Sequence, residues 1–257
     1  MIYEENNKMK IIEKTKEKLV FAAEISESLA NAIRRSANEI PVLAIDEVEI
    51  YKNDSASYDE IVANRLGLVP LKMEKGMNFK EDCTCKGKDC SKCTVQLKLN
   101  KKGPGTVYAQ DLKGKADVVY EKIPIVILKE NQELELVAFA RLGKGKEHAK
   151  FSPGLVYYRN LAEIEIKNCD GCKKCVEACP LGLISCEKKA EIKDSWKCDM
   201  CEACVEVCKK DGRDAVKIKP GKEIIFFIES WGQMEAKEIF NEAIDVLRDN
   251  LKKVGKA

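Results

Sequence analysis

The stretch that decides the fold runs from Cys169 to Cys208, where eight of the chain's thirteen cysteines stand in two copies of one pattern. Its first copy of a repeated pattern reads CDGCKKCVEAC over residues 169–179, and its second reads CDMCEACVEVC over residues 198–208. Both copies are C-x2-C-x2-C-x3-C. Three cysteines at this spacing bind one corner of an iron–sulfur cube, while the fourth binds a second cube. The pattern therefore predicts two [4Fe-4S] clusters.

The expected ligand sets cross between the two copies. Cluster one would be bound by Cys169, Cys172, Cys175 and Cys208, and cluster two by Cys198, Cys201, Cys204 and Cys179. Pro180 follows the first copy, as is typical of this motif, whereas Lys209 follows the second, which alters the exit of the chain but no ligand. A single C-x2-C would also fit zinc or a redox pair, but two full copies favour two cubanes.

The repeat resembles the bacterial-type two-cluster ferredoxins over about residues 166–220. Short alternating segments at Glu163–Lys167 and Ala215–Lys219 bracket it and are candidate strands. Cys186 is left over, and we expect a small side chain there, buried or partly exposed, and not a ligand.

Composition sets limits on the function. The chain has 257 residues, 45 percent of them hydrophobic, which is ordinary for a globular protein of about two domains. Its 45 basic and 43 acidic side chains give a net charge of only +2, so any nucleic-acid role would be local or indirect. The charged N-terminal residues predict no secretory signal, and the longest apolar run, Ile224–Ile228, is too short to span a bilayer. We expect a cytoplasmic protein whose cysteines bind metal.

The N-terminal quarter alternates between strand and helix patterns. Residues 9–24 predict a pair of strands, and Ser26 begins a helix whose apolar positions recur at helical spacing until Pro41. Residues 42–51 alternate as a strand, with a change of phase at Asp46 and Glu47 that indicates a bulge. A polar loop over 52–57 precedes a short helix over 58–66 that ends at Gly67.

A second cysteine-rich segment reads CTCKGKDCSKC over residues 83–93. Its four thiols, Cys83, Cys85, Cys90 and Cys93, fall within eleven residues, and Gly87 permits a turn between the two pairs. Such a set can close a tetrahedral zinc site, and a loop that binds no metal is the alternative. Because protein ligands would fill all four positions, a zinc ion here would be structural.

Short alternating segments dominate from Thr94 to Lys167 and predict a mainly β region, with turn signals between them. The segments are 95–99, 118–120, 125–128, 134–140 and 164–166. Residues 224–230 predict a buried strand, and residues 236–251 predict an amphipathic helix. The only histidine, His148, lies in a polar run and is best explained as solvated.

Several further segments resemble the D subunit of archaeal DNA-directed RNA polymerase. They are SLANAIRR over 28–35, IPVLAIDEVEI over 40–50, NRLGLVPL over 64–71, FSPGLVYYR over 151–159 and IESWG over 228–232. The resemblance covers nearly the whole chain and extends more distantly to the bacterial alpha subunit and the third subunit of eukaryotic polymerase II.

The resemblance implies an α+β protein in three parts. Residues 1–50 and 221–257 would form a dimerisation domain from both chain ends, residues 51–165 a mainly β inserted domain, and residues 166–220 the ferredoxin-like domain. Helices with a rich apolar stripe near each terminus agree with a paired partner, although packing on their own sheet explains the stripes equally well.

The family also implies the function: a non-catalytic scaffold that pairs with the small L subunit and carries the large polymerase subunits. Asn31, Arg34 and Arg35 match the helix that the family uses near its partners, and the 83–93 loop resembles the zinc loop of the eukaryotic counterpart. The sequence contains no Asp-rich metal motif for phosphodiester synthesis. The rival hypothesis is a ferredoxin-type electron-transfer protein with a docking domain. Under the scaffold hypothesis, the clusters would stabilise the third domain and couple assembly to redox or iron status.

Overall fold

A computed structural model describes residues 9–72, 76–210 and 212–255 as a mixed α+β chain, in agreement with the predicted class. The chain forms two compact units. One contains residues 20–31 and 157–227 together with the N-terminal residues up to Lys14, and the other contains residues 15–19, 32–156 and 228–257. The charged N-terminal segment that argued against a secretory signal lies partly outside the described residues.

Most of a four-stranded sheet with the order β1-β2-β12-β9 belongs to the first unit. Its strands are β1 (Lys10–Lys14), β2 (Lys18–Ala23), β9 (Gly154–Ile166) and β12 (Val216–Ser230). Phe21 of β2 stacks on Phe226 of β12 with ring centroids 5.2 Å apart, which joins two neighbouring strands through their side chains. The predicted strand pair over residues 9–24 is confirmed.

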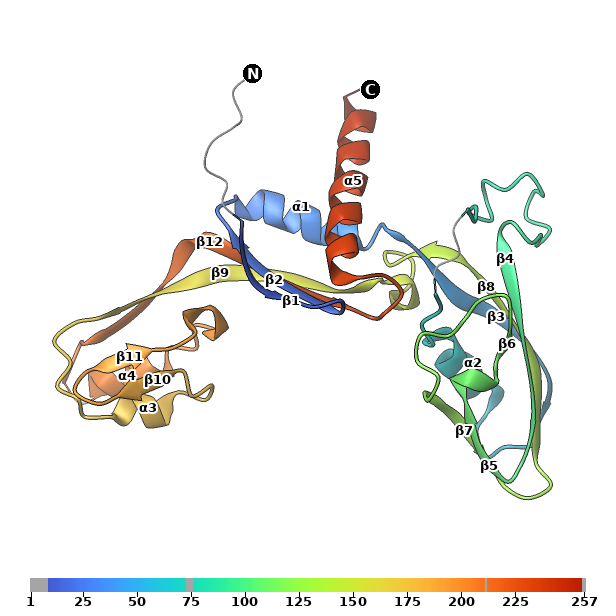
Figure 1. Ribbon diagram of the computed structural model, residues 1–257, viewed down its shortest axis with the longest axis horizontal. Coiled ribbons are helices and arrows are strands. Elements are labelled where there is room, and N and C mark those ends of the chain that lie inside the picture. The colour runs from blue at the N-terminus through green and yellow to red at the C-terminus, as the bar shows by residue number, and fades with distance from the viewer. Residues whose placement is uncertain (1–8, 73–75, 211, 256–257) are drawn as a thin grey trace. The chain divides into compact units, whose positions relative to one another are not determined.

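The two longest strands of this sheet carry the cysteine repeat between them. In Figure 1, β9 and β12 run side by side and the repeat forms a small body at their far end. That body contains α3 (Lys174–Ala178), β10 (Ile184–Cys186), β11 (Ala190–Ile192), the 3-10 turn η3 (Ser195–Lys197) and α4 (Ala203–Lys210). β10 and β11 form an antiparallel hairpin, and α3 packs against α4.

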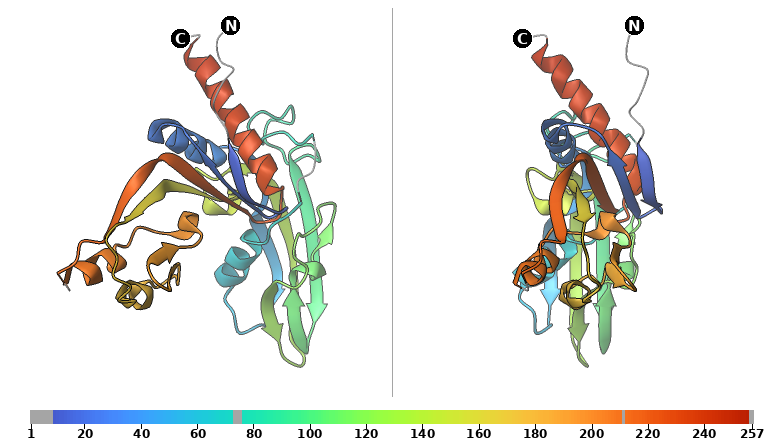
Figure 2. Two further views of the ribbon diagram at one scale, coloured as in Figure 1. Left: turned by 60° about the vertical axis from the view of Figure 1, so that its left-hand side comes forward. Right: turned by 90° about the vertical axis from the view of Figure 1, so that its left-hand side faces the viewer.

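The second unit is built on an antiparallel sheet with the order β3-β8-β4-β6. The strands are β3 (Pro41–Asn53), β8 (Glu133–Lys144), β4 (Thr94–Lys102) and β6 (Lys113–Gly114), and β5 (Gly105–Tyr108) pairs separately with β7 (Pro124–Leu128). The helix α2 (Asp59–Gly67) contacts β3 (Figure 2). Two 3-10 turns, η1 (Ala109–Asp111) and η2 (Ala149–Phe151), complete this unit's loops.

The core of this second unit lies between the sheet, α2 and the β5-β7 pair. Leu43, Leu66, Leu97, Ile125 and Leu136 are each at most 1% exposed, and they come from five different elements. Burying an aliphatic side chain of this size contributes about 1.5–3 kcal/mol. This apolar core is large enough to stabilise the region without help from metal.

Helices α1 (Glu27–Ala37) and α5 (Ala236–Val254) lie near the two ends of the chain. The backbone N–H of Leu29 donates to Oγ of Ser26 over 3.3 Å, as expected for the residue that begins α1. The helix ends at Ala37 and not at Ile40 as predicted. Residues 38–40 form tighter turns instead, since a residue before proline disfavours helical dihedrals.

Two other predictions concern strands. The pairing of β3 with β8 shifts register between Ile45 and Glu47, which confirms the predicted bulge, and β3 continues to Asn53, beyond its expected end. The predicted strand over 118–120 is wrong. Val118 makes only an isolated bridge to Leu71, because the surrounding residues form turns.

Candidate iron–sulfur and metal centres

The two copies of the cysteine repeat share one backbone conformation. In the first copy, Gly171 and Lys173 have φ of 75° and 64°, and in the second copy the equivalent Met200 and Glu202 have φ of 59° and 60°. Left-handed residues alternate here with right-handed or extended ones, which turns successive backbone N–H groups inward. Concave N–H arrays of this kind bind anionic groups, including iron–sulfur clusters.

An aspartate supports each loop from the same position. Oδ1 of Asp170 accepts a hydrogen bond from the N–H of Cys172 over 3.3 Å, and Oδ1 of Asp199 accepts one from the N–H of Cys201 over 3.2 Å. The Arg213 guanidinium lies 2.8 Å from Asp170, and hydrogen bonding to Cys172 and the charge of Arg213 lower the pKa of that carboxyl against the opposing effect of burial. The duplicated sequence thus produces a duplicated loop.

Four cysteines from both copies line one small, partly open cavity. They are Cys179 of the first copy and Cys198, Cys201 and Cys204 of the second, the set expected for cluster two. The remaining lining is mostly apolar, with Ile164, Pro180, Leu181, Leu183, Ile184, Ile192 and Ile218. A mostly apolar lining with four sulfur donors fits a [4Fe-4S] cube, which takes four thiolate ligands.

The thiols in this cavity affect one another. Burial, and then the neighbouring thiols of Cys198, Cys179 and Cys201, raise the pKa of the Cys204 thiol to about 11. The N–H of Leu183 donates to Sγ of Cys179 over 3.4 Å, a contact that stabilises a thiolate. A thiolate is the form that binds metal, and the raised pKa keeps the Cys204 thiol protonated as long as no metal is bound. The thiolates become favourable only when a cationic metal group binds with them.

The cysteines expected for cluster one also gather, around Cys175. Burial, and then the Cys169 and Cys172 thiols, raise the pKa of Cys175. The N–H of Ala190 donates to Sγ of Cys169 over 3.4 Å. Cys208, the fourth expected ligand, is buried on α4 in the same core as Cys175.

Cys186 is half-buried and lies close to the first loop, where a Cβ on Gly171 would be 3.9 Å from its Sγ. This agrees with the small, partly exposed side chain that we expected.

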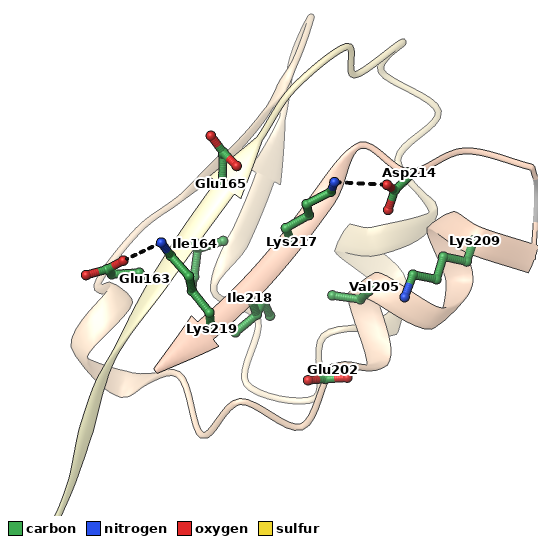
Figure 3. A pocket seen from close by; sticks show the side chains of 10 residues that line it. All are labelled: Glu163, Ile164, Glu165, Glu202, Val205, Lys209, Asp214, Lys217, Ile218 and Lys219. Carbon is green, nitrogen blue, oxygen red and sulfur yellow. Dashed lines mark ion pairs between the residues drawn. The ribbon is translucent and has the colours of Figure 1, made fainter. Parts of the chain in front are cut away.

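A groove of about 750 Å³ in the same unit contains no cysteine among its lining residues (Figure 3). Four of its charged residues pair with one another: Nζ of Lys219 lies 3.1 Å from Glu163, and Nζ of Lys217 lies 3.1 Å from Asp214. Such exposed pairs contribute little energy and require no ligand. The groove is a charged, solvated face of the ferredoxin-like body.

The second cysteine-rich segment gathers its four thiols into one group. The Sγ atoms of Cys83, Cys85, Cys90 and Cys93 all lie within 4.8 Å of one another. The distances are 3.5 Å for 83–90, 3.6 Å for 85–93 and 3.9 Å for 90–93. Sulfurs at about 2.3 Å from a tetrahedral metal would be separated by about 3.8 Å, so the arrangement fits a four-thiolate site.

These thiols shift one another's ionisation in opposite directions. A backbone hydrogen bond from Cys85 lowers the pKa of Cys83, but burial and hydrogen bonds with the thiols of Cys85, Cys90 and Cys93 raise it to about 12. Although burial raises the pKa of Cys85, hydrogen bonds from Cys83, Cys93 and Cys90 lower it to about 6. Asp89 accepts a hydrogen bond from Oγ1 of Thr94 over 2.9 Å and forms an ion pair with Lys80 over 2.8 Å. These contacts fix the loop at the start of β4 and place a cation near the sulfurs.

The residues expected to contact a partner lie on one helix. Asn31 and Arg34 of α1 are half-buried and Arg35 is exposed. His148 is exposed as expected, and its Nδ1 accepts a hydrogen bond from the N–H of Lys150.

Two groups were missed from the sequence. Asp46 accepts bonds from Arg141 (2.6 Å) and Lys150 (2.5 Å), and the charged change of phase in β3 was its only signal. Trp196 packs against Val20, Ile225 and Phe227 of the four-stranded sheet, which no spacing rule could indicate.

Comparison with known proteins defines the class. Residues 48–155 match the RNA polymerase Rpb3/RpoA insert domain, and residues 162–209 match the 4Fe-4S dicluster domain. The first range contains most of the sheet of the second unit, from the middle of β3 onward, and the four-cysteine loop. The second range contains both copies of the cysteine repeat. An Rpb3/RpoA insert domain joined to a dicluster domain places the chain among RNA polymerase subunits that bind iron–sulfur clusters.

Full-length relatives narrow this class. The chain is 43% identical to DNA-directed RNA polymerase subunit Rpo3 of Methanothermobacter thermautotrophicus over 94% of this chain and 95% of the relative. The Rpo3 subunit of Archaeoglobus fulgidus is 38% identical over 90% of this chain and 89% of the relative. The Rpo3 subunit of Methanobrevibacter smithii is 36% identical over 93% of each chain. The chain belongs to the Rpo3 family of DNA-directed RNA polymerase subunits. Within the described residues, no helix has the length and apolar character needed to cross a membrane.

Proposed function

We propose that this chain is the non-catalytic assembly subunit of a cytoplasmic archaeal RNA polymerase. It pairs with the small L subunit, and the pair forms the platform on which the large subunits assemble. Similarity to Rpo3 subunits along nearly the whole chain is the observation that carries this proposal. DNA contacts this chain only indirectly, and phosphodiester synthesis takes place in the large subunits.

The proposed division of labour follows three segments. Residues 1–50 and 221–257 serve dimerisation, residues 51–165 form the inserted domain, and residues 166–220 form the ferredoxin-like domain. The family matches over 48–155 and 162–209 support the inner boundaries.

Helix α5 supports the pairing role, because its apolar stripe continues past its buried part. Ile239 and Ala243 are buried, whereas Leu251 and Val254 are 63% and 74% exposed. An exposed apolar continuation of a buried stripe is typical of a surface that a partner covers. On α1, Leu29 is 43% exposed and lies near Asn31, Arg34 and Arg35, for which we propose partner contacts.

The repeat holds two [4Fe-4S] clusters in this proposal. Cys169, Cys172, Cys175 and Cys208 bind cluster one, and Cys198, Cys201, Cys204 and Cys179 bind cluster two, as supported by the duplicated loops and the four-cysteine cavity. Bound clusters of this type exchange single electrons. Here their main contribution is structural, because a body of this size has too small a core, and a metal site contributes on the order of 10 kcal/mol. Oxidation or iron shortage then weakens assembly.

The loop over residues 83–93 binds one zinc ion through its four thiolates. The separations among the Sγ atoms and the low pKa of Cys85 support this assignment. The ion is structural, because the four cysteines complete its coordination.

The experiment is anaerobic affinity purification of the tagged chain from its own cells, followed by mass spectrometry. Recovery of a small subunit and both large polymerase chains is the expected result. Recovery of oxidoreductases without polymerase chains would favour the electron-transfer rival. The same purification of a Cys172→Ser, Cys201→Ser double variant tests the coupling to iron, which is absent if recovery equals that of the parent.

A variant of α5 locates the pairing surface. Leu251→Asp is expected to lower recovery of the small subunit at least tenfold, because it places a charge on the exposed apolar stripe. Lys253→Gln is the matched control, since it changes the net charge by the same amount on the opposite face of the helix. Equal recovery with the two variants would exclude α5 as the pairing surface.

A further inference from the structure

Trp196 connects the ferredoxin-like body to the four-stranded sheet within one unit. It lies in η3 and packs with Ile12 of β1 against a buried cluster of Val20, Ile225 and Phe227. The buried cluster comes from β2 and β12, which are neighbouring strands of the sheet, and Ile12 of β1 also packs against it. Trp196 is thus the point at which a side chain of the cysteine repeat enters the apolar packing of the sheet.

Arg159 of β9 strengthens this contact. Its Nη2 donates to the carbonyl oxygen of Trp196 over 2.8 Å, and its guanidinium lies 5.1 Å from the centroid of the Phe227 ring. Tyr157 stacks on the same ring, with centroids 4.6 Å apart. Nε of Arg159 is buried and has no hydrogen-bond partner among the described residues. A partly desolvated guanidinium therefore depends on the Trp196 carbonyl and the Phe227 ring.

The position of Trp196 depends in turn on Cys198. The 3-10 turn is closed by hydrogen bonds from the N–H of Lys197 to Asp194 and from the N–H of Cys198 to Ser195, over 2.8 and 3.1 Å. Two residues span at most about 7 Å of extended chain, so Trp196 cannot move far unless Cys198 also moves. Cys198 is one of the four cysteines that line the cavity proposed for cluster two.

We propose that Trp196 and Arg159 form a latch that couples occupancy of cluster two to the stability of the four-stranded sheet. The inference rests on the proposed cluster ligands. The body's own core has eight buried residues, and three of them are the cysteines Cys175, Cys204 and Cys208. Loss of the cluster frees Cys198 and the η3 turn, Trp196 leaves the sheet, and Arg159 loses its acceptor. The centres of β2 and β12 then open more often.

This latch gives iron or redox status a physical route to the polymerase scaffold. β2 leads directly into α1, the helix that carries the proposed partner contacts. The sheet is therefore the element through which a cluster can influence pairing.

Amide hydrogen exchange of the full-length chain tests the latch. The probes are the amides of residues 20–23 in β2 and 224–227 in β12, measured anaerobically before and after the clusters are removed by chelation. Cluster removal from the parent is expected to raise exchange there about tenfold, the scale of losing the packing of one partly buried aromatic side chain. The variant Trp196→Ala is expected to show the same rise with its clusters bound, and removal should then add less than about twofold.

Three further variants separate packing from unfolding. Trp196→Phe preserves an apolar ring and should retain the coupling. Arg159→Gln should give a smaller rise with clusters intact, and it serves as the test if Trp196→Ala fails to fold. Trp231→Ala is the control for removal of the chain's other tryptophan, which is 45% exposed, and it should leave the probes unchanged.

Two outcomes would overturn the latch while leaving the clusters in place. In the first outcome, the probe amides of iron-loaded Trp196→Ala or of iron-loaded Arg159→Gln are as protected from exchange as those of the parent. In the second outcome, cluster removal raises amide exchange equally in the parent and in Trp196→Ala. If iron analysis and visible absorption show that the chain binds no iron, the proposed cluster ligands fail and the latch fails with them. Absorption and exchange thus report on the two proposals separately.

Discussion

Replacement of Gly171 by alanine is expected to destabilise the cluster-loaded protein by about 2–5 kcal/mol. Gly171 has φ of 75°, a conformation that costs an L-residue about 1–2 kcal/mol. A Cβ at this position would also lie 2.8 Å from the backbone oxygen of Lys188. Relieving such a contact by a backbone shift costs a further 1–3 kcal/mol or so. The same shift would move the loop between Cys169 and Cys172.

Gly182 provides a matched control in the same body. Its φ is 62°, but a Cβ there would have no atom within 4 Å. Gly182→Ala should therefore cost only the conformational part, about 1–2 kcal/mol. Both variants reduce the entropy of the unfolded chain equally, so that effect cancels in their difference.

Urea unfolding under anaerobic conditions measures the difference. Visible absorption follows the clusters and far-ultraviolet circular dichroism follows the backbone. We expect Gly171→Ala to release iron at a lower urea concentration than Gly182→Ala, by the equivalent of about 1–3 kcal/mol. Equal midpoints for the two variants would refute the argument, because the Lys188 contact would then have no energetic effect.

The remaining predictions concern the second unit. Burial opposes ionisation of Asp46, but hydrogen bonds and charges from Lys150 and Arg141 outweigh it and lower the pKa of Asp46 below 3.8. The stability that this carboxylate contributes is present above its unfolded pKa and is lost as the pH falls through its folded pKa. In acid titrations Asp46→Asn should therefore lose less stability below about pH 4 than the parent, by about 1 kcal/mol after allowance for solvent screening. An identical pH profile for the two proteins would contradict this. Cys90→Ser should remove one zinc per chain and expose the amides of residues 83–93 to exchange. The amides of the core around Leu97 should stay protected, because that core is apolar. Unchanged zinc content by elemental analysis would show that the loop holds no metal.

Much of the fold could be predicted because its signals are local. The bulge in β3 follows from the change of phase at Asp46 and Glu47, and the start of α1 follows from Ser26. The α+β class is implied by the family resemblance, and the alternation of strand and helix patterns agrees with it. The bulge and the helix start each depend on residues within one turn or one strand pair, which the sequence displays directly.

The long strand β12 shows where local signals fail. The sequence predicts two separate strands over residues 215–219 and 224–230, but β12 continues through Pro220 and Gly221 from Val216 to Ser230. A Cβ on Gly221 would lie 2.7 Å from the oxygen of Leu161, so glycine here allows the close approach of β9. The residue that normally interrupts a strand instead permits the pairing. Only the neighbouring strand, about sixty residues away in sequence, makes this evident.

The cysteine loops contain residues whose conformation the sequence indicates and residues whose conformation it does not. They also explain why the clusters are central to the proposed scaffold. Gly171 suggests a left-handed residue, but its counterpart Met200 does not, and neither Lys173 nor Glu202 would be chosen for positive φ. The three non-glycine residues each cost roughly 1 kcal/mol. A core of eight buried residues, three of them cysteines, is too small to offset that cost. Bound clusters would supply the missing energy at the point where the strain is stored. It follows that loss of iron should release these loops before the sheet, and that Trp196, adjacent to the second loop, is where the release first reaches the rest of the unit.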